Sequence, residues 1–230
     1  KAAENLSHQV CRAGNIKNKL RVLDVGCGFG GTIAHINEHF SDMELIGINL
    51  DERQLSRARQ FTIAAADNCI EFKQANACTL PFPDESFDTV LAVECIFHFP
   101  DRLQFFKEAF RVLKPGGFLA LSDFVPVRLL IPFTKIKLPD AYGAGFYGKC
   151  NVQATQAQYR QLAQNTNLRL SLERDITRHT LPTYSYLKHL AMTKKVSNSV
   201  AFLETATLEI LSKLRLMKYF IYGFEKPLNT

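Results

Sequence analysis

The stretch VLDVGCGFGGT, residues 22–32, decides the fold of this 230-residue chain. An apolar, β-branched run leads into a glycine-rich turn, and the turn leads into an amphipathic segment. A strand, a tight turn and a helix start in succession let backbone N–H groups approach a ligand at the helix N-terminus. The spacing of Gly26, Gly28 and Gly31 also fits the loose dinucleotide pattern G-x-G-x-x-G, so the turn alone does not choose between ligands.

Asp24, two residues before the turn, narrows the choice of ligand. A carboxylate at the end of the first strand repels a pyrophosphate and attracts an ammonium group. The turn therefore suits a cationic ligand better than a dinucleotide.

Short β-rich runs alternate with longer amphipathic runs from residue 21 to 125, which is typical of an α/β domain with a parallel sheet. Asp51 and Gln54 predict an N-cap with a capping box, and the turn 114–117 (KPGG) is expected to end a helix. The predicted strands are 21–25, 43–50, 69–73, 87–93, 117–124, 168–176 and 217–225. The predicted helices are 31–40, 51–67, 101–113 and 155–166, with further helices in 178–216.

These elements predict an α/β, doubly wound, Rossmann-like fold: a mostly parallel seven-stranded sheet with helices on both faces and an inserted lid. We expect a single domain over 1–230. Its predicted parts are an N-terminal helical segment (1–20), a ligand-binding core (21–125), a substrate lid (126–154 and 178–216) and the remainder of the core (155–177 and 217–230).

Composition predicts a globular chain, because 47% of its residues are hydrophobic and 18 are Phe. No run reaches the roughly 18 apolar residues of a membrane span, and the first residues lack the apolar centre of a signal peptide, so we expect a cytoplasmic protein. The chain begins with Lys1 rather than Met, so it can be a piece of something longer. The six cysteines lack metal-ligand spacing, so we expect reduced thiols and no metal site.

Charge is unevenly distributed. Residues 1–125 hold 13 Lys and Arg against 16 Asp and Glu, a net charge of −3, whereas residues 126–230 hold 15 against 6, a net charge of +9. A basic second half favours an acidic partner or substrate, although a solvated helical face explains it equally well.

Four segments, in order, resemble the class I S-adenosylmethionine-dependent methyltransferases. They are VLDVGCGFGG (22–31), GINLDERQLSRAR (47–59), NACTLPFPDESFD (76–88) and FKEAFRVLKPGGFLALSDF (106–124). The form GINL with a Gln shortly after it resembles a small-molecule branch. That branch includes quinone, tocopherol and sterol methyltransferases and the O-methyltransferases of macrolide, polyketide and indolocarbazole natural products.

The resemblance implies that S-adenosylmethionine is the cofactor and that Asp24 lies near its methionine end. Asn49 stands where many relatives carry an acid for the ribose hydroxyls, and Asn76 stands where an acid often precedes Ala in the adenine segment. Either amide can still hydrogen-bond, but without charge assistance, and Asn76 can instead cap a turn. The remaining implied cofactor residues are Gly26, Gly28, Gly30, Leu50, Gln54, Ala77, Cys78 and Val93.

The stretch AVECIFHFPD (92–101) places polar residues at the carboxyl end of the fourth strand, where open α/β sheets bind ligands. Relatives that methylate sugar or polyketide hydroxyls carry a His before a hydrophobic-Pro-Asp triplet, and His98 occupies that position. An aliphatic hydroxyl benefits from such a base. The resemblance implies that Asp123 orients His98. Glu94 can share the base role, hold the cofactor's amino group or accept a hydrogen bond from His98; the alternative for His98 and Asp123 is plain packing and capping.

The leading hypothesis is methyl transfer to a hydroxyl of a small, largely apolar natural product, of polyketide or glycoside type, carried by an acidic carrier protein or free. Aromatic lid residues are expected to form the pocket wall: Phe133, Tyr142, Phe146, Tyr147 and Tyr159, with 129–132. C-methylation of an isoprenoid, sterol or quinone is the rival reaction, and a non-catalytic scaffold is the rival class. Nucleic acid is disfavoured, because the fourth-strand segment lacks an Asn/Asp-Pro-Pro-aromatic stretch and basic and aromatic residues do not interleave.

Overall fold

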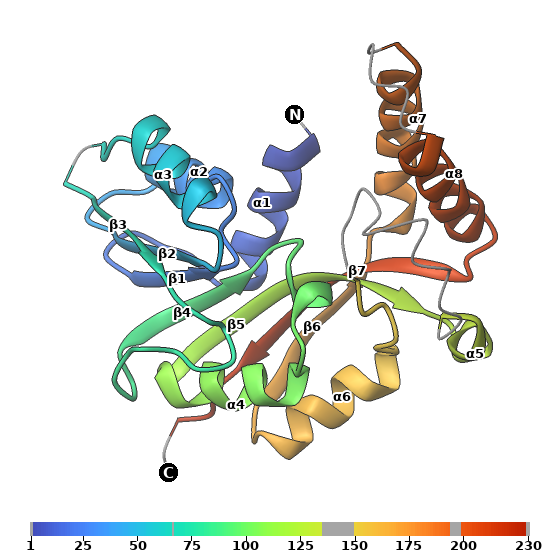
Figure 1. The fold of residues 1–230 in the computed structure, drawn as a ribbon. Coiled ribbons are helices and arrows are strands. Elements are labelled where there is room, and N and C mark those ends of the chain that lie inside the picture. The colour runs from blue at the N-terminus through green and yellow to red at the C-terminus, as the bar shows by residue number, and fades with distance from the viewer. Residues whose placement is uncertain (1, 66, 135–149, 194–198, 229–230) are drawn as a thin grey trace.

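The computed structural model describes residues 2–65, 67–134, 150–193 and 199–228. Its centre is a seven-stranded sheet with the strand order β3-β2-β1-β4-β5-β7-β6 (Figure 1). The strands are β1 (Arg21–Val25), β2 (Glu44–Asn49), β3 (Cys69–Gln74), β4 (Phe87–Ala92), β5 (Leu113–Pro126), β6 (Arg169–Asp175) and β7 (Met217–Glu225). The predicted α/β fold is confirmed.

The direction of the strands places the site. Strands β1 to β5 pair in parallel, and β7 runs antiparallel to both β5 and β6. From β1 the chain builds outward to β2 and β3 and then returns to β4 on the other side of β1. Ligands of open α/β sheets bind at such a reversal, beyond the carboxyl ends of the strands. Here the reversal lies at β1 and β4, so the crevice that such sheets use is expected beyond the carboxyl ends of these two strands.

Helices cover both faces of the sheet. On one face lie α1 (Ala2–Ala13), α2 (Gly31–His39) and α3 (Glu52–Phe61), and on the other lie α4 (Arg102–Val112) and α6 (Gln156–Asn165) (Figure 1). Side chains along β1 point alternately to the two faces of the sheet. Val22 packs against the helices α1–α3, and Leu23 packs against α4 and α6. The two hydrophobic layers hold the strand ends in fixed positions.

Helix α3 is shorter than the predicted helix 51–67 and ends at Phe61. Tertiary hydrogen bonds override the local pattern there. The Asn37 side chain donates to the carbonyl of Ile63 and accepts from the N–H of Ala65, both at 2.9 Å. These bonds hold the backbone after Phe61 away from helical pairing.

The predicted cap at Asp51 is correct, but the capping box is not. Asp51 accepts from the N–H of Arg53 at 2.9 Å. The Gln54 side chain, expected to complete the box, instead accepts from Asn49 Nδ2 at 2.6 Å. Gln54 therefore supports the end of β2 rather than the start of its own helix.

The segment KPGG belongs to β5, not to a separate turn before it. Helix α4 ends at Val112 and β5 begins at Leu113, four residues earlier than predicted. The register between β4 and β5 shifts in this region, and Gly116 adopts a φ of 78°. A Cβ on Gly117 would lie 2.8 Å from the carbonyl oxygen of Lys114, so glycine allows the close approach.

The described parts of the predicted lid contain a 3₁₀ turn η2 (Arg128–Leu130) and the helices α5 (Ile131–Thr134), α7 (Thr177–Thr193) and α8 (Ser199–Lys213). Helices α7 and α8 lie side by side and project beyond the sheet between β6 and β7 (Figure 1). Among the described residues, no helix combines the length and the apolar character that crossing a membrane requires.

Candidate active site

The glycine turn after β1 forms one wall of the crevice. Gly26, Gly28 and Gly30 have φ values of 67°, 55° and 81°, which side chains rarely adopt. A Cβ on Gly26 would lie 2.6 Å from Cys95 Cβ, so packing requires that glycine. Among the described residues, a Cβ on Gly28 would contact only Gln54 Oε1, at 3.9 Å, so the described part of the chain leaves space beside Gly28. Helix α2 starts directly afterwards without a side-chain cap, so its first N–H groups remain available to a ligand.

Asp24 is buried in β1 with 2% of its surface exposed. Burial raises the pKa of its carboxyl to about 8. Within the described residues its carboxylate accepts no hydrogen bond. Burial raises the pKa of the Cys11, Cys27 and Cys95 thiols, and the charge of Asp24 adds to that rise. A buried carboxylate without a partner is costly, and an ammonium group would offset the cost. The structure thus buries Asp24 in β1 as a carboxyl that a cationic group would hold in its ionised form, and its contact with a ligand stays a prediction.

The ends of β2 and β3 lie beside the glycine turn. Asn49 closes β2 and its Oδ1 accepts the N–H of Leu50 at 2.8 Å, while its Nδ2 is bound by Gln54. Leu50 exposes 66% of its surface. Asn49 and Gln54 therefore form a neutral amide pair next to the open face of Gly28, a pairing that the sequence did not predict.

Asn76 is exposed and caps a turn. Its Oδ1 accepts the N–H of Cys78 at 2.9 Å, while the Cys78 thiol donates to the carbonyl of Asp101 at 3.4 Å. Ala77 and Cys78 are each 8% exposed. The contact of Asn76 with adenine stays a prediction.

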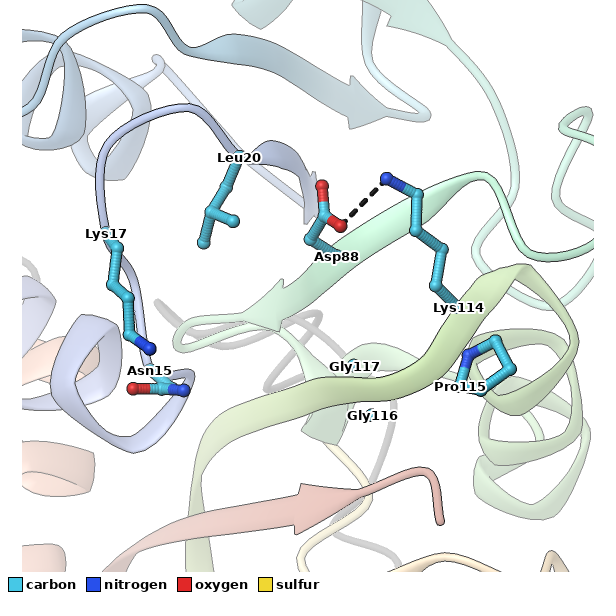
Figure 2. Close-up of a pocket in the computed structure, with 8 residues that line it drawn as sticks. All are labelled: Asn15, Lys17, Leu20, Asp88, Lys114, Pro115, Gly116 and Gly117. Carbon is cyan, nitrogen blue, oxygen red and sulfur yellow. Dashed lines mark hydrogen bonds and ion pairs between the residues drawn. The ribbon is translucent and has the colours of Figure 1, made fainter. Parts of the chain in front are cut away.

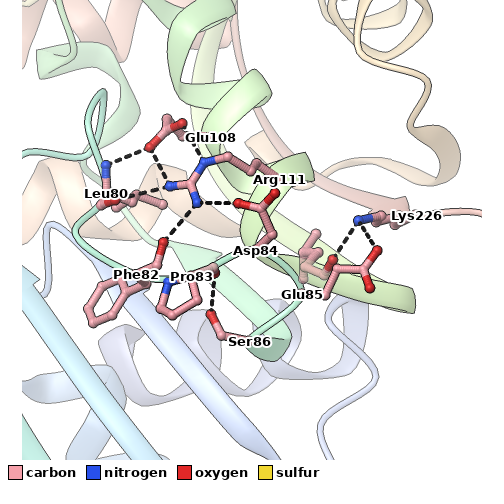
Figure 3. A network of polar contacts seen from close by, with 10 residues as sticks. Leu80, Phe82, Pro83, Asp84, Glu85, Ser86, Glu108, Arg111 and Lys226 are labelled. Carbon is pink, nitrogen blue, oxygen red and sulfur yellow. Dashed lines mark hydrogen bonds and ion pairs between the residues drawn. The ribbon is translucent and has the colours of Figure 1, made fainter.

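A polar clamp that sequence reasoning missed fixes the loop after this turn (Figure 3). Glu108 accepts the N–H of Leu80 at 2.7 Å and pairs with Arg111 at 2.8 Å. Arg111 also donates to the carbonyl of Phe82 and to Asp84, both at 2.8 Å. Because α4 supplies both Glu108 and Arg111, their helical spacing of three was the only signal of the clamp in the sequence.

His98 lies at the end of the 3₁₀ turn η1 (Ile96–His98), directly after β4, and is exposed. The turn packs against the glycine turn, because the Cys95 thiol donates to the carbonyl of Val25 at 3.0 Å. Phe99 Cε1 also lies 3.9 Å from the point where a Gly26 Cβ would be. Val93, between β4 and η1, packs partly buried in the α1–α3 layer. The structure thus brings the segment that carries His98 to the glycine turn.

Asp123 does not orient His98, and this correction has a clear physical cause. Asp123 is fully buried in β5, and its Oδ2 accepts from Arg102 Nη2 at 3.0 Å and from the Tyr159 hydroxyl. Its Oδ1 accepts the N–H of Phe124 at 2.8 Å. Among the described residues, none of its hydrogen bonds is with His98. Burial raises the pKa of Asp123 to about 6, and the Arg102 charge partly opposes that rise.

Tyr159 is likewise not a pocket-wall residue. It lies on α6 with no exposed surface and stacks on Tyr222 of β7. Of the other predicted wall residues, Leu129 is 76% exposed, whereas Tyr142, Phe146, Tyr147 and the side chain of Phe133 lie outside the described residues.

Glu94 occupies the space between the ends of β4, β5 and β7. The Tyr219 hydroxyl donates to its Oε1 at 3.2 Å, and its N–H donates to Ser122 Oγ at 3.1 Å. Burial of the carboxylate against these strands raises its pKa, and the Tyr219 hydrogen bond partly opposes that rise. Tyr219 and Ser122 were missed because the sequence does not reveal which strands are neighbours.

A small cavity lies at the opposite end of the strands, where β1, β4 and β5 begin (Figure 2). It encloses about 170 Å³ and is lined by Asn15, Lys17, Leu20, Asp88 and 114–117. It contains no predicted site residue, and it is smaller than the few hundred Å³ of a typical ligand pocket. The crevice at the strand ends remains the candidate site.

Residues 23–121 match the family model described as a methyltransferase domain. This chain carries a methyltransferase domain. It is 35% identical over 167 residues to the 27-O-demethylrifamycin SV methyltransferase of Amycolatopsis mediterranei (strain S699), covering 72% of this chain and 60% of that enzyme. It is 37% identical over 121 residues to the sterol 24-C-methyltransferase erg6 of Aspergillus fumigatus, covering 52% of this chain and 31% of that enzyme. The chain therefore spans less than two thirds of these curated relatives.

The fold of the methyltransferase domain agrees with solved structures. The geranyl diphosphate C-methyltransferase of Streptomyces coelicolor A3(2), in complex with Mg²⁺, geranyl diphosphate and S-adenosyl-L-homocysteine, superposes with a TM-score of 0.73. It is 18% identical, and the superposition covers 96% of this chain and 80% of that one. The family and such neighbours indicate S-adenosylmethionine as the cofactor. The unpaired Asp24 carboxylate and the open face of Gly28 fit its cationic amino acid end.

Proposed function

We propose that this chain transfers a methyl group from S-adenosylmethionine to a hydroxyl oxygen of a small, largely apolar natural product of polyketide or glycoside type, with His98 as general base. The observation that carries the proposal is the packing of η1 on the glycine turn through Cys95 and Val25. This packing brings the segment that carries the exposed His98 to the turn that follows Asp24, which supports the proposal.

The residues divide the work between binding and proton removal. Asp24 and the N–H groups at the start of α2 hold the cofactor, and Asn49 with Gln54 faces its ribose. The cofactor supplies an electrophilic methyl group on a sulfonium and leaves as S-adenosylhomocysteine. His98 takes the hydroxyl proton as the new carbon–oxygen bond forms, which makes a poor nucleophile competent. Proximity and orientation of the two reactants supply much of the remaining acceleration.

Oxygen is favoured as the acceptor atom by the extent of the similarity. The match to the rifamycin enzyme, named for an acceptor lacking an O-methyl group, spans 167 residues, well beyond the 99 residues of the methyltransferase match. The match to the sterol enzyme spans 121 residues. The longer match to a relative named for an O-demethyl acceptor supports oxygen as the acceptor atom.

C-methylation of an isoprenoid, sterol or quinone is the second candidate, and the sterol 24-C relative supports it. The test is a panel of hydroxylated polyketides, glycosides and isoprenoids, with mass spectrometry of the products. Methylated polyketides or glycosides support the proposal. Methylated isoprenoid carbons, or calorimetry without binding of S-adenosylmethionine, contradict it; the second outcome favours a scaffold.

An acidic carrier protein is the proposed presenter of the acceptor, because residues 126–230 carry a net charge of +9 from 15 basic and 6 acidic side chains. Such attraction weakens as salt screens it. The KM for a carrier-bound acceptor should rise with ionic strength and with neutralisation of the carrier's acids. Indifference to both changes contradicts carrier docking.

A further inference from the structure

Three polar side chains, from β7, from β5 and from the segment that follows β4, form a cluster. Tyr219 of β7 lies 3.2 Å from Glu94 and 3.1 Å from Ser122 Oγ of β5. Tyr219 is 2% exposed and Ser122 fully buried, whereas Glu94 is exposed. The cluster therefore has two buried members and one residue, Glu94, that keeps an exposed surface although the surrounding strands desolvate its carboxylate.

The backbone at Glu94 is held in an unfavourable conformation. Its φ of 53° lies in the left-handed region, which costs a non-glycine residue roughly 1 kcal/mol or more. The hydrogen bond from its N–H to Ser122 Oγ holds it there. Strain of this kind gathers at functional sites, where a side chain must point in one direction.

The sequence left three roles open for Glu94: sharing the base role, holding the cofactor's amino group or accepting a hydrogen bond from His98. The direction of the carboxylate helps to choose among them. Its partner Tyr219 lies on β7, and β5 separates β7 from β4. Asp24 lies on β1, on the opposite side of β4. Burial raises the pKa of Tyr184 of α7, and the charge of Glu94 adds to that rise, as it also does at the adjacent Cys95. The carboxylate is thus turned toward β7 and α7, away from the side of the cofactor's amino group.

Tyr219 uses only part of the accepting capacity of this carboxylate. An ionised carboxyl offers about four lone-pair positions, and Tyr219 fills one. The surrounding strands and helices belong largely to residues 126–230, whose net charge of +9, from 15 basic against 6 acidic residues, disfavours a cationic group. A neutral hydroxyl is the donor that fits.

We propose that Glu94, positioned by Ser122 and Tyr219, binds a second hydroxyl of the acceptor, so that the acceptor class is a polyol rather than an apolar molecule with one hydroxyl. This inference rests on the proposed function for the identity of the acceptor. It makes Glu94 a specificity-determining residue and Tyr219 a positioning residue. The hydroxyl that is methylated faces His98 instead.

The chain offers a matched control. Tyr222 lies on β7 like Tyr219, and within the described residues its buried hydroxyl has no hydrogen-bond partner. Tyr219→Phe and Tyr222→Phe therefore make the same chemical change on one strand, and only the first removes a contact with Glu94. Glu94→Ala removes the carboxylate, and Glu94→Gln keeps a neutral acceptor.

The probes are a macrolactone polyol and its analogue with one hydroxyl fewer, titrated by calorimetry into protein loaded with S-adenosylhomocysteine. We expect the unchanged protein to prefer the polyol about tenfold, corresponding to one charge-assisted hydrogen bond. Glu94→Ala should abolish the preference, Glu94→Gln and Tyr219→Phe should reduce it, and Tyr222→Phe should keep it. The affinity for S-adenosylhomocysteine should change less than twofold in all four variants.

Three results would overturn the inference: no polyol preference in the unchanged protein, a preference that survives Glu94→Ala, or a parallel loss of S-adenosylhomocysteine affinity. Methylation assays on the same probes keep the two proposals distinct. A polyol preference that depends on Glu94, without methyl transfer, contradicts the proposed function and supports the inference. Equal methylation and binding of both probes supports the function and contradicts the inference.

Discussion

The buried carboxylate of Asp123 accepts a hydrogen bond from the guanidinium of Arg102 at 3.0 Å, and not from His98. Arg102 also donates to the carbonyl of Asn151 at 2.5 Å, and the N–H of Asn151 donates to the carbonyl of Phe97 at 2.7 Å. The ion pair therefore links β5, α4 and the turn that carries His98. We infer that this ion pair fixes the position of the turn that carries His98 relative to β5 and α4.

Arg102→Met should destabilise the chain by about 3–5 kcal/mol, because it leaves the Asp123 charge buried without its cation. The free energy of unfolding in urea, at neutral pH and without cofactor, measures this. The double variant Arg102→Met, Asp123→Asn should recover part of the loss, since no charge remains buried. A loss below about 1 kcal/mol, as for an exposed pair, would contradict the structural role.

Cofactor affinity should rise with pH up to about 8. Burial raises the folded-state pKa of Asp24 to about 8, so the free protein binds its proton below that pH. A cationic amino group favours the ionised carboxyl, so at lower pH the Asp24 carboxyl must release its proton when the ligand binds. The Kd then rises by up to about tenfold for each unit by which the pH falls. Calorimetry with S-adenosylhomocysteine between about pH 6 and 7.5 checks this. In Asp24→Asn the dependence should disappear; a flat profile in the unchanged protein would refute the assignment.

The same shift predicts how stability without cofactor depends on pH. A carboxyl whose folded pKa is raised binds more protons in the folded state, so stability falls as pH rises from about 4 toward about 8, at up to about 1.4 kcal/mol per unit. Asp24→Asn should therefore be more stable than the unchanged chain at pH near 8. Urea unfolding at several pH values measures it, and equal slopes in both proteins would be the contrary result.

Gly28→Ala and Gly31→Ala form a matched pair at the glycine turn. Gly28 has a φ of 55° and faces the crevice, so Ala should cost roughly 1 kcal/mol of stability and weaken cofactor binding tenfold or more. Gly31 starts α2, and a Cβ there would contact nothing within 4 Å in the described part of the chain, so Ala should be neutral or slightly stabilising. Thermal unfolding and calorimetry compare the two. Equal effects would place the ligand elsewhere.

His98→Ala should lower turnover on a hydroxyl acceptor by about 10²–10⁴-fold, the usual contribution of a general base. The affinity for S-adenosylhomocysteine should stay within twofold, because the imidazole acts on the acceptor. His39→Ala, at the exposed end of α2, is the control and should leave both quantities unchanged. Full turnover in His98→Ala would contradict the role of His98 as general base.

The sequence was most informative where local chemistry decides structure. The strand, turn and helix of residues 22–39, the Asp51 cap and the aromatic last strand follow from patterns within a few residues. The errors arose where partners far apart in the chain decide. Hydrogen bonds of Asn37 hold the backbone beyond the end of α3. Arg102 and Tyr159 donate hydrogen bonds to Asp123, and Tyr219 donates one to Glu94. Local sequence patterns do not encode such pairings, so the sequence named candidate polar residues for the site but not the partners that the structure gives them.

The central claim is that the methyl group goes to a hydroxyl oxygen with His98 as base. Its most direct test uses S-adenosylmethionine with an isotope-labelled methyl group and nuclear magnetic resonance of the product from a polyol acceptor. We predict a methoxy signal that His98→Ala reduces at least a hundredfold, in line with a lost general base. A label on carbon, or no label transferred by a protein that binds both partners, would contradict the claim.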